Sequence, residues 1–315
     1  MPNYQGVWSL SAQYQNSTGW PIPPLAGDLA INQAGSSASE IASTLQMGYV
    51  VITTTGNGTD FGDATAANAY SAGMSSSTRG VFAYGKETGN ANSNRMDFIT
   101  MRTLGNATDF GDAIATGLKS DSGLSNETRG VMKDANSGNT ISYITIATTG
   151  NASDFGDLSY SRWSLGACAS TTRGVFGGGT DGTRQNIIDY ITIASTGNAT
   201  DFGDLTQVQS DCAGLSSNTR GVFAGGASTG LTNVIQYITI ASTGNAIDFG
   251  DLSASNQYPT GTSNSTRGLF YLGDSSNVIE YITIASTGNA TDFGDTLFGG
   301  GTGKGVVSTA HGGLA

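Results

Sequence analysis

The chain has 315 residues, with 47 glycines, 5 prolines and many Ser, Thr and Asn residues between short apolar runs. Hydrophobic residues make up 37% and charged residues 12%, which argues against a disordered chain and favours one large all-β domain. The formal net charge of −11 disfavours nucleic acid and anionic lipid surfaces as partners.

Two cysteines, Cys168 and Cys212, and a single histidine, His311, are too few for a disulfide scaffold or a metal cluster. We therefore expect no metal or other cofactor, and both cysteines lie in small-residue segments typical of a packed core. No apolar run reaches the length of a membrane span, and the start MPNYQGVWSL does not have the pattern of an export signal. We expect no membrane insertion.

Residues 1–26 lie outside the repeated part of the chain and are predicted to form an N-terminal arm. This segment carries Trp8, Tyr14 and Trp20, followed by three prolines that favour an extended lead-in. Two interpretations remain open. The arm either packs on the domain as a clasp or docks onto a neighbouring protein in an assembly.

The rest of the chain is organised by a GN-x-x-DFGD segment that recurs six times, at intervals of 44–49 residues. Its first glycines are Gly56, Gly105, Gly150, Gly197, Gly244 and Gly288. An aromatic residue stands seven positions before each glycine, and the positions after it alternate, as in Tyr190-Ile191-Thr192-Ile193. Period-two alternation with β-branched residues predicts a strand.

Each DFGD segment is followed after 16 or 17 residues by an arginine in Thr-Arg-Gly, except that the sixth unit has His311 at this spacing. The arginines are Arg79, Arg129, Arg173, Arg220 and Arg267, and the last residues of the DFGD segments are Asp63, Asp112, Asp157, Asp204, Asp251 and Asp295. We expect these arginines to pair with the repeated aspartates of the same or the next unit and so to set the registry between units. Anion binding is the alternative.

Each unit therefore contains four predicted strands: a small-residue strand, a Gly-Val-Phe strand, a Tyr-Ile-Thr-Ile strand and an Asp-Phe-Gly-Asp strand. Four strands in about 46 residues describe one propeller blade. Each end of the chain carries only part of a unit. A small-residue strand near residues 302–309 is not followed by a Gly-Val-Phe strand, and the first strand, near Asp28, is of the Gly-Val-Phe type without a small-residue strand before it. The sequence predicts a six-bladed β-propeller over residues 27–315, closed by pairing of these two strands.

The unit resembles the kelch repeat, in which a glycine pair ends the second strand, an aromatic-apolar strand follows and a turn leads to a short outer strand. It departs from that repeat by carrying Phe110, Phe155 or Phe202 where kelch units have a tryptophan. The strings YITIASTGNATDFGDL and STTRGVFGGG are also similar to repeats of virion structural and tail-associated proteins of marine bacteriophages. This resemblance implies a location in the virion, in its tail region, in multiple copies.

Two motifs suggest chemistry but have simpler explanations. TGNATDFGD carries two carboxylates that could bind calcium, yet its copies are distributed around the ring, so we expect turns without a structural calcium ion. Gly226-Ala227-Ser228-Thr229-Gly230 matches a nucleophile elbow but falls in a loop between two predicted strands. We therefore expect a protein that is not an enzyme.

Binding is predicted on the propeller face whose loops vary between units. These loops carry Tyr160, Arg162, Trp163, Arg184 and Tyr258, which are residue types that often anchor interfaces. We expect a non-enzymatic virion structural protein, tail- or fibre-associated, that binds other virion proteins or a host surface glycan or receptor. The alternative is a lectin-like propeller that binds carbohydrate or a cell surface.

Overall fold

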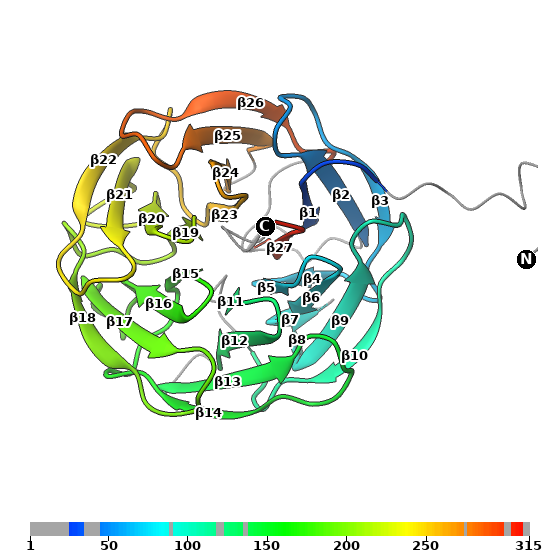
Figure 1. The fold of residues 1–315 in the computed structure, drawn as a ribbon, viewed down its shortest axis with the longest axis horizontal. Helices are drawn as coiled ribbons and strands as arrows, with labels where there is room; N and C mark the ends of the chain where they lie inside the picture. The colour runs from blue at the N-terminus through cyan, green and yellow to red at the C-terminus, as the bar shows by residue number, and fades with distance from the viewer. Residues whose placement is uncertain are drawn as a thin grey trace, which may run out of the picture.

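The computed structural model describes residues 25–34, 45–87, 91–117, 123–134, 138–273, 276–298 and 304–310. The regular elements of these residues are all strands, which form six four-stranded antiparallel sheets and one small three-stranded sheet. The four-stranded sheets follow one another around a central axis (Figure 1). The predicted all-β, propeller-like fold is confirmed. No helix in this part of the chain is long and apolar enough to cross a membrane.

Every four-stranded sheet uses the four predicted strand types in the predicted order from the axis outward. The inner strands are β27 (Val306–Ser308), β5 (Ala72–Ser75), β11 (Gly123–Ser125), β15 (Gly166–Ala169), β19 (Ala213–Ser216) and β23 (Thr260–Ser263). The second strands are β1 (Leu29–Gln33), β6 (Arg79–Ala83), β12 (Arg129–Lys133), β16 (Arg173–Gly177), β20 (Arg220–Ala224) and β24 (Arg267–Tyr271).

The third strands and the outer strands complete the sheets. The third strands are β2 (Gln46–Val51), β9 (Arg95–Thr100), β13 (Thr140–Thr145), β17 (Ile187–Thr192), β21 (Val234–Thr239) and β25 (Val278–Thr283). The outer strands are β3 (Thr59–Asp63), β10 (Thr108–Asp112), β14 (Ser153–Asp157), β18 (Thr200–Asp204), β22 (Ile247–Asp251) and β26 (Thr291–Asp295).

The two ends of the described chain meet in one sheet, as predicted. The last strand, β27, pairs antiparallel with β1, so that Ala30 lies opposite Ser308 and Ile31 opposite Val307. The resulting order is β27-β1-β2-β3. This pairing covers an edge of β1 and an edge of β27 that would otherwise be open to other chains.

The three-stranded sheet was not predicted. It consists of β4 (Asn68–Ala69), β7 (Lys86–Glu87) and β8 (Ala91–Asn92), and it lies beside the sheet that contains β6 and β9 (Figure 1). Asn68 lies opposite Glu87, and Lys86 lies opposite Asn92. The long connection between β6 and β9 therefore folds back and pairs with the short strand that precedes β5.

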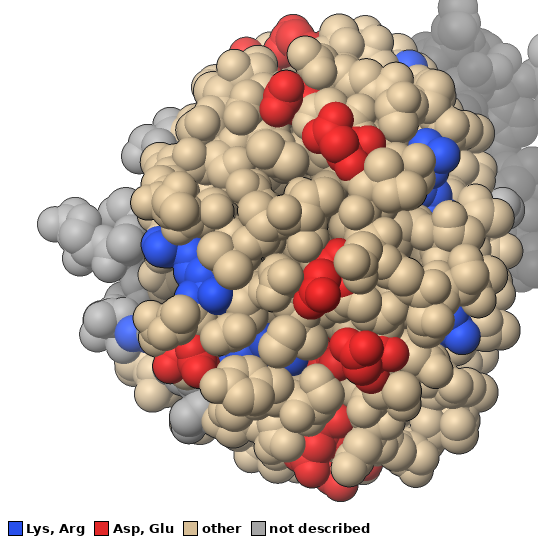
Figure 2. All heavy atoms as spheres, turned by 90° about the vertical axis from the view of Figure 1, so that its left-hand side faces the viewer, with Lys and Arg blue, Asp and Glu red and all other residues tan. Residues whose placement is uncertain are grey.

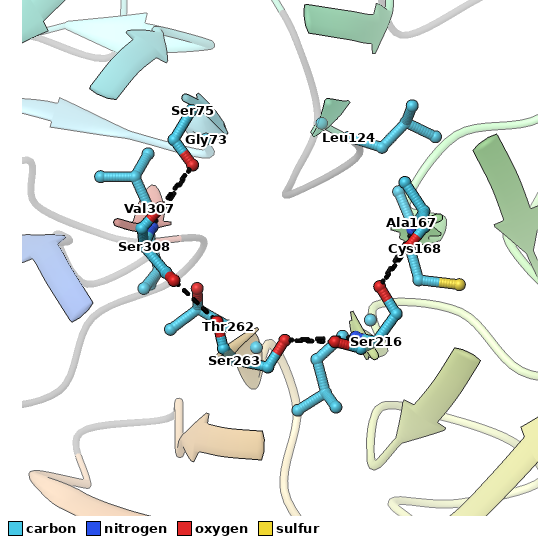
Figure 3. Close-up of a pocket in the computed structure, with 16 residues that line it drawn as sticks. Gly73, Ser75, Leu124, Ala167, Cys168, Ser216, Thr262, Ser263, Val307 and Ser308 are labelled. Carbon is cyan, nitrogen blue, oxygen red and sulfur yellow. Dashed lines mark hydrogen bonds between the residues drawn. The ribbon is translucent and has the colours of Figure 1, made fainter. Parts of the chain in front are cut away.

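Small residues are required in the inner strands because these strands pack closely around the axis. A Cβ on Gly73 would lie 2.1 Å from the Val306 carbonyl oxygen, and a Cβ on Gly214 would lie 2.2 Å from that of Ala167. Serine hydroxyls link successive inner strands, as in Ser263 Oγ to the Ser216 carbonyl oxygen at 2.6 Å (Figure 3). Two pockets lined by residues of the inner strands have volumes of about 40 and 30 Å³.

The prediction of ion pairs between the Thr-Arg-Gly arginines and the repeated aspartates is wrong. The Arg220 guanidinium carbon instead lies 4.1 Å from the centre of the Tyr237 ring, and Nη1 donates to the Ile284 carbonyl oxygen of the next sheet at 2.8 Å. The same hydrogen bond is made by Arg79, Arg129, Arg173 and Arg267. The two ion pairs found among the described residues involve other arginines. His311 lies outside the described residues.

The Gly-Asn turns connect neighbouring sheets as well as neighbouring strands. Asn245 Oδ1 accepts the Asp204 backbone N–H at 3.0 Å, and Gly244 N donates to the Phe202 carbonyl oxygen at 2.8 Å. The same asparagine bond joins all six neighbouring pairs of sheets, through Asn57, Asn106, Asn151, Asn198, Asn245 and Asn289. The turn prediction is confirmed, and the asparagine bonds between sheets are an addition to it.

The aspartates of the outer strands are spread over the molecule. In Figure 2 acidic groups form a row of separate patches along the outer wall. Among the described residues, no group of three or more His, Cys, Asp or Glu side chains could hold a metal ion. The absence of a structural calcium ion stays a prediction, to be tested by chelation.

Candidate functional site

The antiparallel order of the strands gives the molecule two different faces. The turns after the inner and third strands form one face, which carries the Thr-Arg-Gly and Gly-Asn turns and is called here the repeated face. The loops after the second and outer strands form the opposite face, whose sequences differ between sheets, and it is called here the variable face. The candidate binding residues all belong to variable-face loops.

Exposed apolar side chains are concentrated on the variable face. Eight large hydrophobic side chains are exposed among the described residues, and two of them, Leu104 and Ile247, lie in or next to the Gly-Asn turns of the repeated face. The other six lie in variable-face loops: Leu45, Ile114, Tyr160, Val208, Leu231 and Leu297. Single exposed apolar residues are ordinary on protein surfaces, but among the described residues the variable face carries more of them than the repeated face.

Three of the predicted binding residues are brought together between β14 and β17. Backbone bridges pair Trp163 with Thr180 and Thr180 with Arg184, so two loops are joined into a small ladder. Trp163 is partly exposed, whereas Tyr160 and Arg184 are exposed. Tyr160 is 43% exposed, which leaves nearly half of its surface open to a partner.

Hydrogen bonds hold this group in place. The Tyr160 hydroxyl donates to Asp181 Oδ2 at 2.6 Å, and Asp181 Oδ1 accepts the Thr183 N–H at 2.9 Å. The bond from Tyr160 and the backbone bond from Thr183 lower the pKa of Asp181, and the same carboxylate raises the pKa of Tyr160. The carboxylate is therefore ionised at neutral pH and orients the exposed ring.

The prediction of Arg162 as a surface contact is wrong. Its side chain is fully buried, its Nη1 lies 3.0 Å from Asp189 Oδ2, and its Nε donates to the Gly178 carbonyl oxygen at 2.8 Å. The signal was present in the repeat, because the residue five positions after the last DFGD aspartate is polar in other units too. Those equivalents are the buried residues Asn68, Gln209 and Asn256.

Tyr258 belongs to a different part of the variable face. It is partly buried, and its ring packs edge-on against Tyr70 with 6.0 Å between ring centres. Both tyrosines have positive φ, 58° and 57°, and each stands two residues before an inner strand. This left-handed conformation is unusual for a bulky residue and turns the chain from the outer wall toward the axis.

Two further charged residues, at the start of a variable-face loop, are buried. Lys133 donates to the backbone carbonyl oxygen of Asp134, and both side chains are shielded from water. Burial raises the pKa of Asp134 to about 6 and lowers the pKa of Lys133 to about 8. The sequence shows only a polar dipeptide at the end of a strand and gives no sign of this burial.

The arm residues Trp8, Tyr14 and Trp20 lie outside the described residues. The described lead-in lies on the repeated face, where Leu25 N donates to the Arg102 carbonyl oxygen at 2.8 Å and Arg102 Nη1 donates to that of Gly27 at 2.8 Å. The choice between a clasp and a docking arm therefore stays open.

The two cysteines and the serine of the nucleophile-elbow match lie where the sequence predicts them. Cys168 and Cys212 are buried, as predicted, and burial raises the pKa of the Cys168 thiol. Ser228 lies in the loop between β20 and β21, as predicted, and its backbone N–H donates to the Gly230 carbonyl oxygen at 2.7 Å.

Comparison with known proteins does not assign the chain to a family. No protein-family model matches the chain, and no curated protein matches it. Function must therefore be argued from the site itself.

Proposed function

We propose that the chain is a non-enzymatic binding module that docks onto another protein through its variable face. In this proposal the six four-stranded sheets are the blades of a kelch-like propeller, and the β4-β7-β8 sheet is an elaboration of its loops. The asymmetric distribution of exposed apolar side chains carries the proposal, because six of the eight lie on that face. A rigid ring that presents variable loops is a common arrangement for recognition.

The surface chemistry favours a protein partner. Tyr160 combines an exposed aromatic ring with a fixed hydroxyl, and Leu231 adds an aliphatic side chain that is 52% exposed. Covering such residues removes apolar surface from water, and a ring already held by Asp181 loses little conformational freedom on binding. Arg184, exposed in the same loop as Asp181, adds a cation to this face.

We further propose that the partner is another virion protein and that the chain is a tail- or fibre-associated component of a phage particle. The support is the resemblance of the strings YITIASTGNATDFGDL and STTRGVFGGG to repeats of phage structural proteins. Immunogold electron microscopy of purified particles tests this directly. Label at one fixed, symmetric position is expected, and particles without label would contradict it.

Substitution of Leu231 by Ser should weaken incorporation into particles without changing the melting temperature. The loss expected for one exposed anchor is about 1–3 kcal/mol of binding free energy. Leu104→Ser is the matched control, because Leu104 is 44% exposed but lies on the repeated face. Quantitative mass spectrometry of purified particles gives the copy number of each variant. An equal loss of copy number for both variants, or no loss for Leu231→Ser, would show that the variable face is not the docking surface.

A further inference from the structure

The repeated face carries surface pockets of its own. A pocket of about 310 Å³ lies at the turn between β13 and β14, and one of about 280 Å³ lies at the turn between β2 and β3. The two turns belong to different sheets, and both pockets are lined by the same seven positions of the repeat. The pocket therefore belongs to the repeating unit.

The fold explains only part of this lining. At the β13–β14 turn, Asn151 Oδ1 holds the neighbouring sheet by accepting the Asp112 N–H, and Gly150 has a φ of 154°. The exposed hydroxyl of Thr148 and the Nδ2 group of Asn151, in contrast, make no hydrogen bond to any residue that the structure describes. Space beside Gly150 is open, because a Cβ added there would meet no atom within 4 Å.

The same polar positions are kept in other hairpins. The β17–β18 and β25–β26 hairpins both have the sequence Tyr-Ile-Thr-Ile-Ala-Ser-Thr-Gly-Asn-Ala-Thr, with Ser195 and Ser286 at the position of Thr148. The β21–β22 hairpin ends in Ile247 instead of Ser or Thr. The β9–β10 hairpin has Arg102 and Leu104, and Arg102 binds the chain's own lead-in.

The lining has a definite chemistry. It offers hydroxyls, a primary amide and a half-buried tyrosine ring, and the pocket lining itself includes no charged side chain. At the β13–β14 turn the Arg129 guanidinium covers part of the tyrosine ring, with its carbon 4.3 Å from the centre of the Tyr143 ring. Sugar rings combine apolar faces with hydroxyls, so this set suits a neutral saccharide. An anionic sugar would meet the acidic groups of the outer wall (Figure 2) and a net charge of −11.

We propose that these hairpin pockets bind single neutral hexopyranose units, at the β2–β3, β13–β14, β17–β18 and β25–β26 turns. Their volume lies near the lower end of small-ligand pockets, which fits one sugar ring. Each shallow site is weak alone, but several sites on one rigid ring bind a polysaccharide with much higher avidity. This site is separate from the variable face and independent of the docking proposed above.

Amide NMR titration with the methyl α-D-pyranosides of glucose, galactose and mannose tests the pockets one by one. We expect at least one of these glycosides to shift the signals of Gly150, Asn151 and their equivalents in the other three hairpins, whereas N-acetylneuraminic acid shifts none. Thr148→Val should abolish the shifts at the β13–β14 turn alone. Thr229→Val on the variable face is the matched control and should abolish none. Shifts confined to variable-face loops, or no shifts with any of the three glycosides, would overturn the proposal.

The avidity is measured on columns of immobilised dextran, galactomannan and mannan. The quadruple variant Thr54→Val, Thr148→Val, Ser195→Ala and Ser286→Ala should lose retention by at least about tenfold on the polymer that retains the wild type. Wild-type retention that survives all four substitutions would also overturn the proposal. Incorporation into particles is expected to be normal for this variant, so failure of the sugar sites and failure of the docking face are distinguishable.

Discussion

The same buried position holds different polar residues in neighbouring sheets. Next to one sheet Arg162 and Asp189 form a fully buried ion pair, and Asp189 Oδ1 also accepts the Ser159 hydroxyl at 2.6 Å. In the next sheet Gln209 and Gln236 take these positions, with 2.6 Å between Gln236 Nε2 and Gln209 Oε1. The two buried positions are therefore occupied by side chains that form hydrogen bonds to the loop, whether these side chains are charged or neutral.

Arg162→Gln alone should destabilise the protein, because Asp189 remains buried without its cation. The expected loss is about 3–5 kcal/mol in the free energy of unfolding, the usual cost of breaking a buried ion pair. The double variant Arg162→Gln with Asp189→Gln copies the neutral pair of the next sheet and should recover most of this loss. Urea unfolding measures both variants. A double variant as unstable as the single one would show that the charges themselves are required.

The buried Asp134 predicts a pH dependence of stability. Its pKa in the folded protein, about 6, lies above its ordinary value of 3.8, so the folded state binds the proton more tightly. The stabilisation is complete below the ordinary value and is lost as the pH rises through about 6. Asp134→Asn should therefore raise the melting temperature at pH 7 and flatten its change between about pH 4 and 7. Thermal unfolding across this range tests it, and an unchanged profile would contradict it.

At the scale of the strands, the sequence predicts what depends on periodicity and spacing. The alternation in Tyr190-Ile191-Thr192-Ile193 identifies the third strands. A small residue six positions before each Thr-Arg-Gly arginine, glycine in every unit except for Ala167, identifies the inner strands. Contacts between sheets could not be predicted in this way. Arg220 lies opposite Thr239 in its own sheet, whereas Asp204 belongs to the outer strand of the preceding sheet. The constant spacing of the two residues along the chain suggested an ion pair, but spacing alone does not show that two side chains meet.

Glycine in the DFGD strand should be irreplaceable where neighbouring sheets meet. A Cβ on Gly203 would lie 2.6 Å from the carbonyl carbon and oxygen of Gly244, backbone atoms that cannot move alone. Gly197 is the matched control, because its φ of 156° is also positive but a Cβ there would meet nothing within 4 Å. Gly203→Ala should lower the free energy of unfolding by about 1–3 kcal/mol more than Gly197→Ala, as overpacking does in cores. Equal melting temperatures for the two variants would contradict this.

At the scale of the whole molecule, the offset ends were enough to predict closure, but the binding face was only partly predictable. Repetition identifies the loops that vary, and these contain exposed Tyr160 and Arg184. Arg162 was nevertheless predicted to lie on the surface, although the polar residue that recurs five positions after the last DFGD aspartate indicated a shared buried position. Leu45, Ile114, Val208, Leu231 and Leu297 were missed, because an isolated apolar residue in a loop gives no sign of its exposure.

Removal of residues 304–315 should open the ring. Without β27, the hydrogen bonds from Ala30 to Asn32 lose their partners, and the Ser75 hydroxyl loses the Ser308 carbonyl oxygen that it bonds at 3.0 Å. An exposed strand edge favours pairing with another chain. We therefore expect a lower and broader thermal transition, together with dimers or larger species in light scattering after size exclusion.

A synthetic peptide of residues 304–315 provides the control for that truncation. If the missing strand itself causes the loss, the peptide should bind the open edge beside β1 and raise the melting temperature of the truncated protein with increasing concentration, because a ligand of the folded state stabilises it by mass action. A peptide with Val307→Asp should not do so, since Val307 is buried in the core beside β1. A truncated protein that melts like the intact one would show that the hydrogen bonds of Asn57 and Arg267 hold the β1-β2-β3 and β23-β24-β25-β26 sheets together without β27.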